Sequence, residues 1–148
     1  MKPFSFRLEK VLRYRAHLEK KVHLQFCEAA EKVKEHETRI ARLGDTRVDA
    51  AGRLADERAK GIFVCRDHIH GSFIQGLADR IAEQGRDLDK SLEKLERLRS
   101  LLYVVATKKR SLESLKDVQF ARFNEEREKM EQKLLDDLVL MIKKRGET

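Results

Sequence analysis

Residues with the chemistry for catalysis or metal binding are sparse in this chain of 148 residues. The best candidate is Cys65 followed by His68 and His70, because thiolate and imidazole groups are ligands that zinc prefers. Their spacing differs from that of the recognised structural zinc patterns, and exposed histidines are common in turns. We therefore predict that the chain holds no metal ion.

Acid–base catalysis would need titratable groups held in an enclosed site. Adjacent carboxylates occur at Glu125-Glu126 and at Asp136-Asp137, but both pairs fall in open, highly charged stretches that form no pocket. The sequence also contains no glycine-rich phosphate loop, no nucleophile elbow and no zinc-protease helix motif. We therefore predict that the protein is not an enzyme and binds no cofactor.

The composition is typical of long helices. Charged residues make up 40% of the chain and aromatic residues 6%, with one proline and no tryptophan, which does not suit a compact α/β or all-β domain. Intrinsic disorder is the competing interpretation of such a charged chain. The regular spacing of its apolar residues argues against disorder.

A long second helix is predicted from about residue 72 to residue 144, a stretch without proline. Ser72, with Gln75 three residues later, has the form of a capping box at its start. Apolar residues recur with a period of about 3.5 residues, which is the seam of a coiled coil. They are Ile74, Leu77, Ile81, Leu88, Leu92, Leu95, Leu98, Leu102, Val105, Leu112 and Leu115.

A first helix is predicted from about residue 5 to residue 60, with Pro3 and Ser5 near its start. Gly44 and Gly52 would weaken it by about 1 kcal/mol each relative to alanine, so we expect bending there and not an end. Two heptad series form its seam, with Arg15, Glu19, His36 and Arg47 as polar members. The series are Leu12, Glu19, Phe26, Val33, Ile40, Arg47, Leu54 and Leu8, Arg15, Val22, Ala29, His36, Leu43, Ala50.

The helical pattern breaks between the two helices, at about residues 61–72. The stretch 61–65 is β-like and the stretch 67–71 is turn-like. Two long helices joined by such a turn form an antiparallel hairpin. We therefore predict an all-α fold, a long antiparallel two-helix coiled-coil hairpin that forms a single domain over residues 1–148.

The second helix is predicted to project beyond the first, because it is longer when both are counted from the turn. The projecting part begins at Asn124 and has little intramolecular cover. Exposed apolar residues of this kind usually mark a partner site, and self-association in a homodimer is the alternative. The apolar residues are Met130, Leu134, Leu135, Leu138, Val139, Leu140, Met141 and Ile142.

The net charge is +7 at pH 7, and basic residues gather near both ends of the chain. Such ends attract acidic protein surfaces, nucleic acid or anionic lipid. Zinc-finger, RRM, KH and basic-zipper signatures are missing, so we predict no nucleic-acid partner. No apolar run is long enough to cross a bilayer, and residues 1–12 have no signal-peptide core. Cys27 and Cys65 form no disulfide framework. We therefore expect a soluble cytoplasmic protein.

Several short motifs resemble the FliJ family of bacterial flagellar export proteins. The opening Phe6-Arg7-Leu8-Glu9-Lys10-Val11-Leu12-Arg13-Tyr14-Arg15 resembles the start of that family. The stretches 112–116 (LESLK) and 128–139 (EKMEQKLLDDLV) are similar to its C-terminal pattern. Phe73-Ile74-Gln75, followed by Leu77, resembles a family segment near the start of the second helix.

The resemblance implies a cytoplasmic component of the flagellar type III export apparatus, needed for flagellum assembly and motility. Family members fold as an antiparallel two-helix coiled coil similar to the central stalk of rotary ATPases. Their paired terminal ends engage the hexameric export ATPase, and their hairpin region is associated with the export gate protein in the membrane. Members also handle export chaperones, and such a protein reaches the inner membrane only through protein contacts.

Residue by residue, the resemblance gives two sets of partner-binding candidates. The gate set is Phe73 and Leu77, together with Leu43 on the first helix; Arg80 and Gln84 stand where the family would have alanine and histidine. The ATPase set is Leu8, Arg13, Met130, Leu134, Leu138 and Met141.

A structural scaffold homodimer and an injectisome stalk protein remain as alternative functions.

Overall fold

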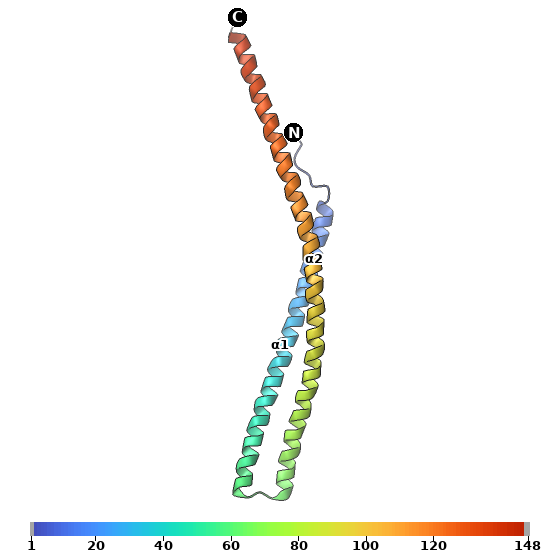
Figure 1. The fold of residues 1–148 in the computed structure, drawn as a ribbon, viewed down its shortest axis with the longest axis vertical. Helices are drawn as coiled ribbons and strands as arrows, with labels where there is room; N and C mark the ends of the chain where they lie inside the picture. Colours follow the sequence, from blue (N-terminus) through green and yellow to red (C-terminus); the bar gives the residue numbers. More distant parts are fainter. Residues whose placement is uncertain (1, 147–148) are drawn as a thin grey trace. The chain divides into compact units, whose positions relative to one another are not determined.

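The computed structural model describes residues 2–146 and consists of two long helices, α1 (Glu9–Lys60) and α2 (Val64–Gly146) (Figure 1). The helices pack against each other, and residues 2–146 contain no strand. The predicted all-α helical hairpin is therefore confirmed. The chain divides into two compact units, a terminal unit (Met1–Lys20 with Tyr103–Thr148) and a tip unit (Lys21–Leu102).

Helix α1 begins at Glu9, later than the predicted start near residue 5. The Glu9 N–H donates to the Phe6 carbonyl at 3.1 Å, while Phe6 itself lies outside the helix with a side chain only 6% exposed. The segment before α1 is not helical, and in this arrangement the Phe6 side chain is buried, which stabilises the later helix start. The helix runs through Gly44 and Gly52 without ending.

The connection between the helices is much shorter than predicted. Helix α2 begins at Val64, so the predicted turn over residues 61–72 and the capping box at Ser72 are both wrong. Gly61 ends α1 with φ at 91°, a left-handed conformation that glycine adopts without the penalty of a Cβ atom. Asp67 lies in the first turn of α2, where a carboxylate stabilises the helix dipole.

The core of the tip unit is a thin line of apolar side chains. Val22, Ala29, Val33 and Leu54 of α1 are buried there, and all four occupy predicted seam positions. Leu77 of α2 is buried in the same unit. No side chain of residues 2–146 is completely buried, because each helix can cover only one side of its partner.

A side-chain hydrogen bond joins polar residues of the two helices in the tip unit. The ring Nδ1 of His36, on α1, lies 3.1 Å from Oε1 of Gln84, on α2, in a part-buried position. A polar seam pair of this kind favours one register, because a shifted register would leave both groups without a partner. None of the described helices combines the length and apolar character that a bilayer span requires.

Candidate partner-binding surfaces

Aromatic contacts attach the N-terminal segment to α2 in the terminal unit. The Phe4 ring lies 5.1 Å from that of Phe120 in an edge-to-face arrangement, and 5.6 Å from the tilted ring of Phe123. These separations and orientations are those that aromatic pairs prefer. The segment before α1 is therefore held against α2 near residues 120–123.

Two ion pairs fix the position of α1 along α2 in the same unit. Lys116 Nζ lies 2.8 Å from Glu9 Oε2, and Lys109 Nζ lies 2.8 Å from Glu19 Oε2. The hydrogen bond to Glu19 is the main cause that raises the pKa of the Lys109 ammonium. Glu19 is one of the predicted polar seam residues, and its charge is matched by a lysine of the facing helix.

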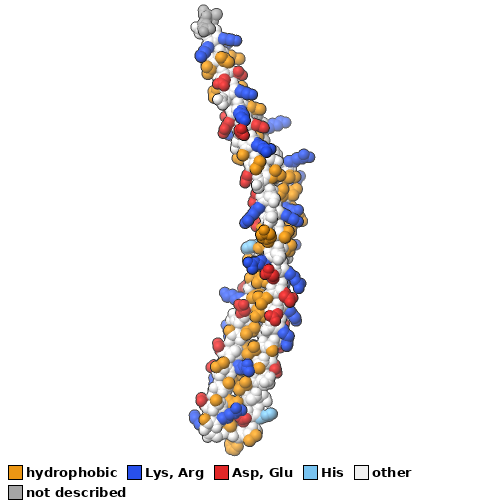
Figure 2. Space-filling model, viewed as in Figure 1, with side chains coloured by type: hydrophobic (Ala, Val, Ile, Leu, Met, Phe, Trp, Pro, Cys, Tyr) orange, Lys and Arg blue, Asp and Glu red, His pale blue; other side chains and the backbone are white. Residues whose placement is uncertain are grey.

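Beyond these contacts α2 continues as the C-terminal segment, which we define as residues 124–146 (Figure 1). From residue 125 onward every described residue is exposed. Each apolar side chain from Met130 to Ile142 exposes more than half of its area. Figure 2 shows apolar side chains interspersed with both signs of charge along this segment, and the apolar ones from Met130 to Ile142 lie open to solvent.

An arginine-lined groove lies between the helices of the tip unit. Its volume is about 440 Å³, and α1 and α2 each contribute three residues with the same i, i+3, i+4 spacing. That spacing places three side chains on one face of a helix. The residues are Arg39, Arg42 and Leu43 from α1, and Arg80, Glu83 and Gln84 from α2.

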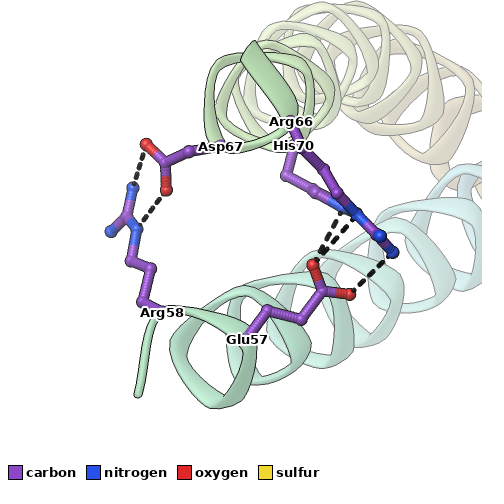
Figure 3. Close-up of polar contacts among 5 residues, drawn as sticks. All are labelled: Glu57, Arg58, Arg66, Asp67 and His70. Carbon is purple, nitrogen blue, oxygen red and sulfur yellow. Dashed lines mark hydrogen bonds and ion pairs between the residues drawn. The ribbon is translucent and has the colours of Figure 1, made fainter. Parts of the chain in front are cut away.

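Charged residues pair across the end of the hairpin (Figure 3). The Arg58 guanidinium donates from Nε and Nη2 to the two carboxylate oxygens of Asp67, the second at 3.2 Å. Glu57 Oε2 lies 3.3 Å from Arg66 Nε and 3.4 Å from His70 Nε2. The hydrogen bond from Arg58 holds the pKa of the Asp67 carboxyl below its usual value.

The sequence reasoning missed this cluster because it placed residues 61–72 in a turn. Once α2 starts at Val64, Arg66, Asp67 and His70 face the last turn of α1. The only signal in the sequence is that an acidic and a basic residue lie next to each other on both sides of Gly61, as Glu57-Arg58 and Arg66-Asp67. Within the described part of the chain, no three Cys, His, Asp or Glu side chains gather as a metal site would need, and His70 pairs with Glu57.

Comparison with known protein families identifies the chain. A family model described as Flagellar FliJ protein matches residues 4–148. The chain belongs to the FliJ family. Comparisons with curated proteins and with solved structures give no match. Membership of this family makes the chain a component of the flagellar export apparatus, and the resemblance seen in the sequence motifs is confirmed.

The candidate ATPase residues of this FliJ-family chain all fall in the terminal unit. Leu8 is 36% exposed just before α1, and Arg13 is exposed with its Nε 3.9 Å from Glu9 Oε1. These two flank or lie within the first turn and a half of α1, near Glu9, which pairs with Lys116 of α2. The other four lie in the C-terminal segment, and all are exposed: Met130, Leu134, Leu138 and Met141.

The candidate gate residues differ in their exposure. Phe73 is 53% exposed, and Leu43 is half-buried beside the arginine-lined groove. Leu77 is 4% exposed, so its side chain belongs to the core of the tip unit. Phe73 and Leu43 are thus accessible from solvent in the folded hairpin, whereas the Leu77 side chain is not.

Proposed function

We propose that this FliJ-family chain is a noncatalytic, stalk-like coupling protein of the flagellar type III export apparatus. It binds the hexameric export ATPase through its paired terminal ends, promotes ATPase assembly and activity, and connects the ATPase to the membrane export gate. It also handles export chaperones. Its place is cytoplasmic, associated with the inner membrane through protein contacts only.

The exposed apolar surface of the C-terminal segment is the observation that carries this proposal. Side chains such as Leu134 and Leu138 are more than half exposed, although burial of their remaining exposed area would stabilise each by about 1–2 kcal/mol. Contiguous exposed apolar surface on a helix usually marks a protein partner. Lys143 and Lys144 follow in the last turn and would steer docking to an acidic surface.

Contact with the export gate is assigned to the tip unit. Phe73 carries this part of the proposal, because a large aromatic side chain that is 53% exposed can fill a pocket on a partner. Leu43 adds apolar surface beside the groove. The separation of ATPase contacts and gate contacts into different units would let the chain hold both partners together.

The decisive experiment titrates the full chain into the cognate export ATPase and follows binding by calorimetry and ATP turnover. The variant Leu134→Asp with Leu138→Asp should bind at least about a hundredfold more weakly, since two apolar contacts are lost and two carboxylates would be buried. Circular dichroism should report unchanged helix content. Unchanged affinity of this variant would refute the proposed ATPase surface.

The matched control carries the same change at exposed apolar residues of α1 in the tip unit, Leu24→Asp with Val48→Asp, and should bind normally. If the unaltered chain does not bind a folded ATPase, the apolar segment instead favours the scaffold homodimer. Sedimentation equilibrium would then give twice the mass of one chain. The description of the matching family supports the flagellar system over the injectisome.

A further inference from the structure

The lining of the groove between α1 and α2 in the tip unit carries three positive charges and one negative charge. Arg39, Arg42 and Arg80 line it, and Glu83 is its single acidic residue. Within residues 2–146, none of these three guanidinium groups forms an ion pair, whereas Arg58 and other arginines of the chain do. The groove therefore presents three donor groups that no carboxylate of the described chain satisfies.

Two of the residues that line the groove, Leu43 and Gln84, are held in place by the fold. Leu43 is half-buried and supplies an aliphatic surface among the arginines. Gln84 is fixed by its 3.1 Å contact with the ring of His36, across the two helices. Arg39 and Arg42 also line a second depression of about 400 Å³ along α1, which includes Glu31 and Glu35, but neither arginine forms an ion pair with these carboxylates in the described chain.

We propose that this groove binds a short acidic protein segment that carries an aliphatic side chain. Carboxylates of the segment pair with Arg39, Arg42 and Arg80, and the aliphatic side chain lies on Leu43. The guanidinium fork matches a carboxylate with two parallel hydrogen bonds, which makes an arginine cluster a good reader of acidic peptides. The inference rests on the proposed docking of a partner on this face, and it adds the chemistry of that partner.

The makeup of the groove argues against other anionic partners. It has no aromatic side chain on which a nucleic-acid base could stack. A lipid surface favours large apolar side chains inserted beside many lysines, whereas this groove offers one half-buried leucine and one acidic residue, Glu83. The charge of the groove and its aliphatic side chain thus favour a protein segment.

The test uses the full chain and a fluorescein-labelled synthetic peptide, Glu-Asp-Leu-Asp-Glu-Leu-Glu, with binding followed by fluorescence anisotropy. The variant Arg42→Glu with Arg80→Glu reverses one charge on each helix. Both side chains are exposed, so folding should be unaffected. We expect its affinity for the peptide to fall by about tenfold or more, as for the loss and reversal of two exposed ion pairs.

The matched control is Arg53→Glu with Arg99→Glu, which makes the same change of net charge, again with one exposed residue on each helix of the tip unit. It should retain affinity within about twofold, because these arginines do not line the groove. Replacement of the peptide leucines by serine should also weaken binding. Equal loss in both double variants, or insensitivity to the leucines, would overturn the inference.

Vesicles containing phosphatidylserine separate a protein segment from a membrane. If the unaltered chain binds vesicles through Arg42 and Arg80 but does not bind the peptide, the inference fails in favour of a lipid surface. Swimming assays on Phe73→Ala report separately on the proposed function. If Phe73→Ala abolishes swimming but the unaltered chain does not bind the peptide, only the inference about the groove is refuted. If the unaltered chain binds the peptide but Phe73→Ala swims normally, only the proposed gate contact of Phe73 is refuted.

Discussion

The substitution Leu77→Ala should separate a core role from a surface role at the face assigned to the export gate. Leu77 is 4% exposed, while Phe73, four residues earlier on α2, is 53% exposed. Truncation of either residue would remove apolar contacts from the same face. Only the truncation of Leu77 removes contacts from the interior of the hairpin, so the two variants should differ sharply in stability.

The size of the effect follows from burial. Leu→Ala changes in protein cores cost about 2–5 kcal/mol, and the cost is smallest where neighbouring atoms can close the gap. Since no described side chain of this chain is completely buried, the helices can close part of the gap. We expect a loss of about 2–3 kcal/mol for Leu77→Ala, which lowers Tm by about 5–10 °C in a chain of this size.

Phe73→Ala should change stability by less than about 1 kcal/mol, because a half-exposed ring gives up little buried area and alanine has the higher helix propensity. Thermal unfolding followed by circular dichroism measures both variants. Equal Tm losses, or no loss for Leu77→Ala, would refute the placement of Leu77 in the core. Reduced swimming by Phe73→Ala at unchanged Tm and unchanged ATPase binding would support the gate contact, and normal swimming would refute it.

Two further predictions concern local contacts. The pKa of Asp67 is lowered in the folded state from its ordinary 3.8, so the stabilisation by Arg58 is present above that pH and disappears as the pH falls through the folded-state pKa. The stability of Asp67→Asn should lack this contribution to the pH dependence, as measured by acid unfolding curves. Identical curves for the variant and the unaltered chain would contradict the pairing of Asp67 with Arg58. Phe4→Ala removes the ring contacts with Phe120 and Phe123, worth about 0.5–1.5 kcal/mol per pair beyond burial. Amides near the start of α1 should then exchange faster with solvent while the tip unit is unchanged, and unaltered exchange at α1 would contradict this.

Much of the fold could be predicted because the heptad pattern is regular. Val22, Ala29, Val33 and Leu54 were assigned to the seam from spacing alone, and all four are buried. The pattern could not locate the connection. The β-like and turn-like residues after Gly61 have only weak local preferences, which a glycine in the left-handed region and the following helical turns of α2 override.

Some features of the partner-binding surfaces could likewise be predicted from the sequence, and others could not. The exposed C-terminal segment was predicted from the difference in helix length, since chain left over after pairing has no cover. Leu77 fitted both the seam and the motif of the gate surface, and only its burial separates the two roles. The pairing of Arg58 with Asp67 could not be predicted while Asp67 was placed in a turn.

By itself, the sequence determined that the chain forms two helices with a narrow apolar seam, belongs to the FliJ family and leaves an apolar segment uncovered. These properties depend on spacing along one helix at a time. The tertiary structure decided which residues meet across the helices, including the arginine-lined groove and the His36–Gln84 pair. These contacts between helices depend on the register of one helix against the other. Many buried contacts set that register together, so no single stretch of sequence determines it.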